Sequence, residues 1–163
     1  MRRKVKRDVA HTIRTSMTCS LKENGREFVI EVSGDRKSDA IHIDDKPYTE
    51  LLKSRCDYAI EVFSDEPKRA FFFVELKGAD VLKAAEQLVY TAEHLQDYCH
   101  LLDYTPYAKR FACIVATHGM IPAILTRYQK YEARLKKCGF EALKCKTRRM
   151  LVQIDVAENV TWR

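Results

Sequence analysis

The hydrophobic and polar positions of the chain divide it into short apolar runs and two longer segments with helical spacing. Two runs rich in Val, Ile, Phe and Tyr, residues 57–63 and 70–77, flank a polar segment at 64–69 that contains Asp, Glu and Pro. Aromatic and β-branched residues favour strands, so this pattern predicts a β-hairpin. Over residues 78–102 apolar side chains recur about every 3.6 positions, which predicts a long amphipathic helix directly after the hairpin.

The rest of the chain completes one α/β domain over residues 1–163, with a basic arm over about 1–14. Asn24 and Gly25 predict a tight turn between strands at 15–22 and 26–33. A strand at 40–43 and a short helix at 48–54 come before the hairpin. The apolar run 110–117 predicts a central strand with helices on both faces. A second helix at 121–137 ends before Gly139, and strands at 140–146 and 150–156 are expected to pair at the sheet edge. The predicted fold is one mixed sheet of about five to seven strands with the two long helices on its faces.

Three charged residues stand at the open end of the predicted hairpin. Side chains alternate faces along a strand, so Glu75 and Lys77 share a face. A loop centred near Pro67 places Asp57 across from Lys77 and Ala59 across from Glu75. All three charges then lie on one face at one end of the hairpin, and a slip of one residue would separate them.

Charged side chains seldom enter an apolar strand pair without partners, and a divalent cation is one such partner. Mg²⁺ or Mn²⁺ takes oxygen ligands, commonly one or two carboxylates, which Asp57 and Glu75 supply. Lys77 would orient the attacking water or stabilise charge that develops on a scissile phosphate. This constellation predicts metal-dependent phosphodiester hydrolysis. The competing interpretation is a surface strand with a solvated charge pair.

The trio resembles a known family. Asp57, followed eighteen positions later by Glu75, Leu76 and Lys77, resembles the PD-(D/E)xK nuclease superfamily. The resemblance implies a restriction-endonuclease-like mixed sheet flanked by helices, catalytic roles for the trio, Mg²⁺ or Mn²⁺ at Asp57 and Glu75, and a nucleic-acid substrate, DNA rather than RNA. Gln87 resembles the helical Gln of the RecB-like branch and is a further catalytic candidate, although its spacing to the next Tyr is one residue shorter than in that branch.

Several alternatives stay open on the sequence alone. Glu50 is a candidate third carboxylate, as is Asp8, although an exposed helical Glu is the competing interpretation of Glu50. A homodimer would provide two active sites for two strands. The chain is also compatible with an inactive nuclease-fold module that binds nucleic acid or a protein partner, and less so with an enzyme that uses an unrelated carboxylate site.

Charge is unevenly distributed along the chain, whose net charge is +6. Residues 1–7 carry +5, and residues 126–149 carry nine basic residues against two glutamates, so the remainder is acidic. Basic segments on either side of an acidic middle are expected of a protein that holds a polyanionic backbone around a metal site. A solvated basic helix face is the alternative. The predicted nucleic-acid-binding residues are Arg2, Arg3, Lys4, Lys6, Arg7, Arg127, Lys130, Arg134, Lys137, Arg148 and Arg149.

Composition narrows the classes of protein to which the chain could belong. No apolar run approaches the length that crosses a bilayer, and the first residues lack the apolar core of a signal peptide, so we expect a cytoplasmic protein that does not bind a membrane. The six cysteines include no CxxC pair, which argues against a zinc site and for reduced, packed thiols.

Overall fold

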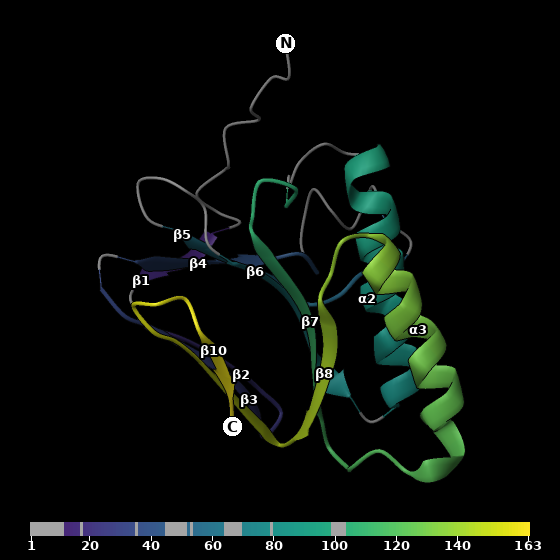
Figure 1. The fold of residues 1–163 in the computed structure, drawn as a ribbon. Coiled ribbons are helices and arrows are strands. Elements are labelled where there is room, and N and C mark those ends of the chain that lie inside the picture. Colours follow the sequence, from purple (N-terminus) through teal and green to yellow (C-terminus); the bar gives the residue numbers. More distant parts are fainter. Residues whose placement is uncertain are drawn as a thin grey trace.

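Two mixed β-sheets and two α-helices form the described part of the chain in a computed structural model (Figure 1). The structure describes residues 12–16, 18–34, 36–44, 52, 54–63, 70–78, 80–98 and 104–163. These residues form ten strands in two sheets, so the prediction of a single sheet of five to seven strands is wrong. The mixed α/β class and the single domain agree with the sequence.

The larger sheet has six strands in the order β1 (Thr12–Ser16), β4 (Lys37–His42), β5 (Tyr58–Phe63), β6 (Ala70–Gly78), β7 (Lys109–Ala116) and β8 (Ala142–Thr147). Strands β1, β4, β5 and β6 pair antiparallel, whereas β6, β7 and β8 pair parallel. Helix α2 (Val81–Tyr98) connects β6 to β7, and α3 (Leu125–Lys137) follows β7 and precedes β8. The carboxyl ends of the three parallel strands therefore lie at one edge of this sheet.

The smaller sheet has the order β10 (Val160–Trp162), β9 (Arg149–Ile154), β3 (Arg26–Val32) and β2 (Thr18–Glu23). The predicted tight turn between β2 and β3 is confirmed, because Asn24 (φ 48°) and Gly25 (φ 75°) both have the positive φ that a type I′ hairpin needs. The predicted first strand is divided, however. Residues up to Ser16 pair with β4 in the larger sheet, and those from Thr18 pair with β3.

Both helices cover the same face of the larger sheet, and the smaller sheet covers the other (Figure 1). Along β7, Ala112 and Ile114 pack in the core beneath the helices, while Cys113 and Val115 pack in the core between the sheets. The prediction of helices on both faces is thus wrong. A continuous apolar run shows that a strand is buried on both faces, but not what covers each face.

The two predicted long helices are present. Helix α3 is preceded by the 3₁₀ turn η2 (Pro122–Ile124) and ends as predicted at Lys137, before Gly139, whose φ of 85° suits glycine. Gly139 N–H bonds to Lys136 O (3.0 Å) and Phe140 N–H to Leu135 O (3.1 Å), the pattern of a Schellman cap. No helix within the described ranges is both long and apolar enough to span a membrane.

The two closing strands are present, but the prediction that they pair with each other is wrong. Strand β8 extends the larger sheet beside β7, and β9 enters the smaller sheet parallel to β3. Arg148, with φ 64°, lies at the change of sheet between them. The predicted short helix at 48–54 lies outside the described residues, except for Leu52 and Ser54.

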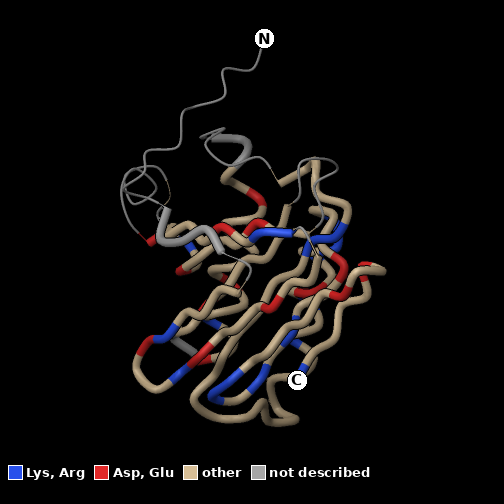
Figure 2. The backbone as a smooth tube through the Cα atoms, turned by 90° about the vertical axis from the view of Figure 1, so that its left-hand side faces the viewer, with Lys and Arg blue, Asp and Glu red and all other residues tan. Residues whose placement is uncertain are grey.

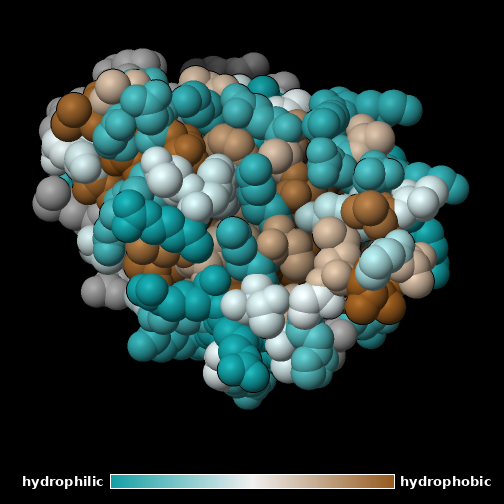
Figure 3. Space-filling view, turned by 60° about the horizontal axis from the view of Figure 1, so that its bottom comes forward, coloured by the Kyte–Doolittle hydropathy of each residue, from teal (hydrophilic) through white to brown (hydrophobic). Residues whose placement is uncertain are grey.

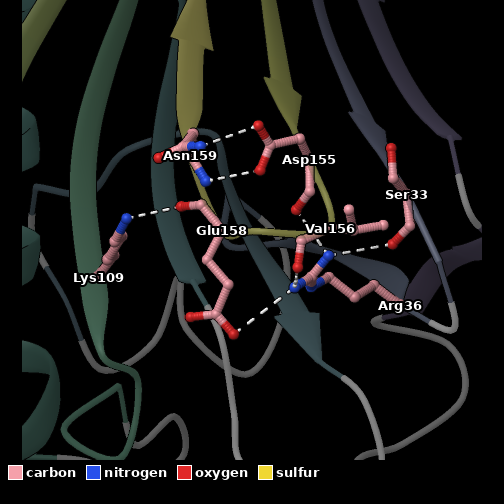
Figure 4. Close-up of polar contacts among 7 residues, drawn as sticks. All are labelled: Ser33, Arg36, Lys109, Asp155, Val156, Glu158 and Asn159. Carbon is pink, nitrogen blue, oxygen red and sulfur yellow. Dashed lines mark hydrogen bonds and ion pairs between the residues drawn. The ribbon is translucent and has the colours of Figure 1, made fainter.

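Arg36 holds together the end of the molecule that lies away from the carboxyl ends of β6, β7 and β8 (Figure 4). It is only 4% exposed, and its guanidinium donates to the carbonyl oxygens of Ser33 (3.2 Å), Asp155 (2.7 Å) and Val156 (3.1 Å). The same group approaches Glu158 Oε1 at 3.6 Å. This single buried cation ties the β3–β4 connection to the β9–β10 turn, which is a structural role.

Candidate functional site

Asp57 and Glu75 meet where β5 begins and β6 nears its end. Tyr58 pairs with Val74 in the antiparallel register of these strands, and Asp57 and Glu75 are the next residue along each strand. The register thus brings the two acidic residues to facing positions at one end of the hairpin.

The predicted register itself is wrong by two residues. Ala59 pairs with Phe73 rather than with Glu75, so Asp57 is not across from Lys77. A shift of two leaves every side chain on its expected face, and for that reason the hydrophobic pattern does not distinguish the two registers. The pairing of Val62 with Ala70 centres the connection on residue 66 rather than on 67.

Both acidic residues belong to the sheet face that the helices cover. Ala59 and Phe73 pack in the core beneath the helices, whereas Val74 packs between the sheets. Alternation along each strand therefore places Asp57 with Ala59 and Glu75 with Phe73. Asp57 is 2% exposed and Glu75 is fully buried. Two carboxylates deep on one face of a sheet are an uncommon arrangement, because burial of a charge is costly without compensation.

Asp57 joins three strands through its side chain and its backbone. Its Oδ2 atom accepts a hydrogen bond from the backbone N–H of Leu76 at 2.8 Å. Its carbonyl oxygen accepts from the N–H groups of Ile43 (2.8 Å) and Asp44 (3.3 Å), just beyond β4. The carboxylate is therefore held against β6 beside Glu75, and its position is fixed by the backbone around it.

The buried thiol of Cys56 precedes Asp57 directly and is affected by the charges of both carboxylates. Burial raises the pKa of Cys56 well above its ordinary value, and the negative charges of Glu75 and Asp57 raise it further. The Cys56 N–H donates to Thr91 Oγ1 at 2.8 Å, so α2 holds the segment that leads into Asp57.

A polar cavity of about 290 Å³ lies beside this segment. Arg55 forms an ion pair with Asp44 at 2.7 Å, and both line the cavity. Arg55 lies two residues before Asp57, and the N–H of Asp44 donates to the Asp57 carbonyl oxygen. The first turns of α2 supply the opposite wall. The lining residues are Asp44, Ser54, Arg55, Lys83, Glu86 and Gln87.

Gln87, a catalytic candidate from the sequence, lies in this cavity wall. Its Nε2 donates to the carbonyl oxygen of Arg55 at 3.1 Å, two residues before Asp57. The structure therefore gives Gln87 a positioning contact to the segment that carries Asp57, and its side chain also lines the neighbouring cavity.

Three other candidates lie wholly or partly outside the described residues. Lys77 belongs to β6, two residues after Glu75, but its side chain lies outside the described residues. Glu50 and Asp8 also lie outside them. Among the residues that the structure describes, no group of three or more His, Cys, Asp and Glu side chains is arranged to hold a metal ion. The described donor set is the carboxylate pair, which fits a cation that takes one or two carboxylates and completes its shell with water and substrate.

The predicted basic residues fall into three groups. Those of the first seven residues lie outside the described chain. Arg127, Lys130, Arg134 and Lys137 are exposed on α3, but Arg134 is committed to Glu93 of α2, to which its Nε and Nη2 donate at 2.9 and 2.6 Å. Arg148 and Arg149 are exposed at the β8–β9 turn, and Arg149 contacts Glu27 Oε2 at 2.9 Å.

Figure 2 shows that basic and acidic positions are interspersed on the side of the molecule away from the helices. Glu27, for example, approaches Lys22 at 3.4 Å as well as Arg149. A uniform basic surface is therefore absent from the described strands of the smaller sheet. The basic segments that remain as candidates for phosphate contacts are α3 and the β8–β9 turn.

Thr91 and Arg55 are the residues at this site that sequence reasoning missed. Thr91 is fully buried, and its hydroxyl donates to Gln87 O at 2.7 Å while it accepts from Cys56. A hydroxyl within the apolar repeat of a helix was a signal that it has a specific partner. Arg55 carried no comparable signal, since its role depends on the path of the chain past α2.

Comparisons of the chain with protein-family models, with curated proteins and with solved structures find no match.

Proposed function

We propose that this protein is a metal-dependent nuclease that hydrolyses phosphodiester bonds in nucleic acid, with DNA as the favoured substrate. The observation that carries the proposal is the pair of buried carboxylates, Asp57 and Glu75, at facing positions on one face of the hairpin, with Lys77 two residues further along β6. Buried carboxylates at facing positions of a hairpin favour a bound cation, since mutual repulsion and desolvation both penalise the ion-free pair.

The chain's own residues would divide the work. Asp57 and Glu75 would hold Mg²⁺ or Mn²⁺, and the hydrogen bond from Leu76 keeps the Asp57 carboxylate oriented toward β6. When bound, the cation supplies a Lewis acid that stabilises negative charge on the phosphate. Lys77 would orient the attacking water or neutralise the same developing charge from its own side chain.

The surroundings of the pair support a polyanionic substrate. The neighbouring cavity offers cationic and amide donors from Arg55, Lys83 and Gln87, together with two acceptors, which suits a sugar-phosphate unit better than an apolar ligand. Exposed basic residues on α3 and at the β8–β9 turn add sequence-independent attraction.

The topology also supports the proposed restriction-endonuclease-like fold. An antiparallel hairpin, β5–β6, leads through α2 into the parallel strand β7, in a mixed sheet with helices on one face. One fold can carry many activities, so the proposed activity depends on the residues of the site.

A cleavage assay on the full chain tests the proposal. Single-stranded, duplex and branched DNA and RNA would be incubated with Mg²⁺ or Mn²⁺, each with an EDTA control. Glu75→Gln should lower cleavage by orders of magnitude, and Lys77→Ala by roughly 10²-fold or more, as for loss of an electrostatic donor. A wild type that cuts none of these substrates, or variants that cut equally well, would show the assignment to be wrong.

Metal binding can be tested without activity. A cation that binds only the folded state raises stability, by about 2.7 kcal/mol at a concentration one hundred times its dissociation constant. Mn²⁺ should therefore raise the melting temperature of the wild type and of Lys77→Ala, but not that of Glu75→Gln. An equal shift in all three proteins would place the metal elsewhere.

One observation favours a second candidate, an inactive nuclease-fold module that binds nucleic acid or protein. The Asp57 carboxylate already has a structural contact with the Leu76 N–H, and both acidic side chains are almost wholly buried. A module of this kind would bind nucleic acid with no Mn²⁺-dependent stabilisation and no cleavage.

A further inference from the structure

Exposed apolar side chains are concentrated in one short segment. Within the described residues, the large exposed hydrophobic side chains are Met120 (37% exposed), Ile121 (58%), Leu125 (42%) and Val156 (72%). The first three fall within six consecutive positions, in the connection from β7 through η2 to the first residue of α3. We name Met120, Ile121 and Leu125 the apolar prong.

The prong stands at the edge of the sheet where β6 ends. Ala116, the last residue of β7, pairs with Gly78 at the end of β6 and with Thr147 at the end of β8. The connection to the prong starts at the next residue, Thr117. Open α/β sheets bind ligands outside the carboxyl ends of their parallel strands, and Glu75 lies three residues before the end of β6.

Basic residues lie on the segments that neighbour the prong. On α3 Leu125 is followed by Arg127 and Lys130, and Thr147, which pairs with Ala116, lies between Lys146 and Arg148. Arg127 on α3 and Arg148 in the β8–β9 turn are exposed on either side. Arg26, the first residue of β3, donates to Thr117 Oγ1 at 2.6 Å. The acidic neighbours in the β2–β3 hairpin are Glu23 and Glu27, and Glu27 is paired with Arg149.

Figure 3 turns this lower end of the molecule toward the viewer and shows hydrophobic side chains in patches among hydrophilic ones. We name Arg26, Arg127 and Arg148 the basic rim. An apolar protrusion next to such a rim is complementary to a polyanion with an apolar interior. Duplex nucleic acid has that character, since phosphates lie outside and stacked bases inside.

We infer that the apolar prong inserts against the base stack of a duplex beside the cleavage site, while the basic rim holds the phosphates on either side. This inference rests on the proposed nuclease function and adds a substrate class, duplex DNA that can be opened at a base step. Apolar wedges of this kind partly unstack a step and bend the duplex, and pyrimidine–purine steps yield most easily. Cleavage is therefore expected to favour sites near TA or CA steps.

Base unstacking is measured directly with full-length protein in EDTA, so that no cleavage occurs. Duplexes with 2-aminopurine at a TA step should brighten when the wild type binds. The double variant Met120→Ser/Ile121→Ser should lose most of this increase and bind the duplex roughly tenfold more weakly. It should keep the salt dependence of the wild type, because the rim is unchanged. Val156→Ser is the matched control, an exposed apolar residue beyond the far end of β9, and should behave as the wild type.

A second variant guards against misfolding of the first. Ile121→Trp keeps an apolar side chain at a highly exposed position, and its fluorescence should be quenched by duplex above the background of Trp162, whereas that of Val156→Trp should not. Equal 2-aminopurine signals from wild type and double variant, or no quenching of Ile121→Trp, would overturn the inference.

Other binding partners of the prong would give distinct results. Dimerisation seen by light scattering and abolished by the double variant would assign it to a second copy of the chain. Prong-dependent binding to phosphatidylserine vesicles would assign it to a membrane surface, and either result overturns the inference. Cleavage without unstacking would contradict the inference about the prong and leave the proposed nuclease function intact. Unstacking without cleavage would contradict the nuclease function alone. Absence of any duplex binding would contradict both.

Discussion

The carboxylate of Asp57 accepts the backbone N–H of Leu76 at 2.8 Å, across the open end of the β5–β6 hairpin. Leu76 is fully buried and immediately follows Glu75. This bond determines where one carboxylate of the proposed metal site lies relative to the other. It also gives Asp57 two roles, in the fold and in the site, that substitutions can separate.

Asp57→Asn and Asp57→Ala should differ in stability but not in activity. The amide oxygen of Asn can still accept the Leu76 N–H, whereas Ala leaves that buried donor unsatisfied, which costs about 1–3 kcal/mol. We expect urea unfolding to show the larger loss for Asp57→Ala, and both variants to lose metal-dependent stabilisation. Equal stability of the two variants would mean that the hydrogen bond contributes little to folding.

Thr91→Val should loosen the segment that carries Asp57. Val has nearly the same shape but cannot accept the Cys56 N–H, so a buried donor loses its partner at a cost of about 1–3 kcal/mol. Thr91→Ser keeps the hydroxyl and should cost less. Hydrogen exchange at the Cys56 amide provides the local measurement, with faster exchange expected in Thr91→Val than in Thr91→Ser. Unchanged exchange in both would contradict the role assigned to Thr91.

The local elements of the fold could be read from the sequence because each rests on nearby residues. Asn24-Gly25 specifies its own turn, Gly139 ends α3, and the apolar repeat of α2 spans its full length. Sheet membership could not be read in this way. Cys113 and Ile114 look alike in the sequence, yet one packs against a sheet and the other beneath a helix.

The candidate site was predictable to a similar extent. Alternation along β5 and β6 correctly puts Asp57 and Glu75 on one face, because a register shift of two residues leaves every side chain on the same face of the sheet. The contacts of Arg55 with Asp44 and of Cys56 with Thr91 join segments that only the folded chain brings together. They depend on the route of the chain after β4, which no local pattern specifies.

Basic residues should contribute unequally to nucleic-acid binding. Affinity should fall steeply with salt, by roughly 0.7–0.9 units of slope in log K against log salt for each phosphate contact. Deletion of residues 2–7 should shallow the slope by a few units. On α3, Arg127→Ala and Lys130→Ala should each shallow it more than Arg134→Ala, since Arg134 is already engaged by Glu93. Equal effects of the three α3 substitutions would show that the Glu93 contact does not compete with phosphate.

Stability should decline at alkaline pH because of buried thiols. Burial raises the pKa of both Cys56 and Cys113 well above the ordinary value. Above about pH 8.5 the unfolded chain therefore releases thiol protons that the folded chain retains, which favours unfolding. The stabilisation from the neutral thiols is complete below that pH and is lost as the pH rises toward the folded pKa, at up to about 1.4 kcal/mol per pH unit for each thiol.

Cys113→Ala isolates one of these contributions. Its free energy of unfolding, measured with urea between about pH 8 and 10, should fall with pH less steeply than that of the wild type, because one titrating thiol is gone. Val115→Ala is the matched control, since Val115 is equally buried on the same face of β7 and carries no ionisable group. It should lower stability by a similar amount at every pH and keep the wild-type slope. If Cys113→Ala and Val115→Ala show the same slope, the buried thiol is not the source of the alkaline loss.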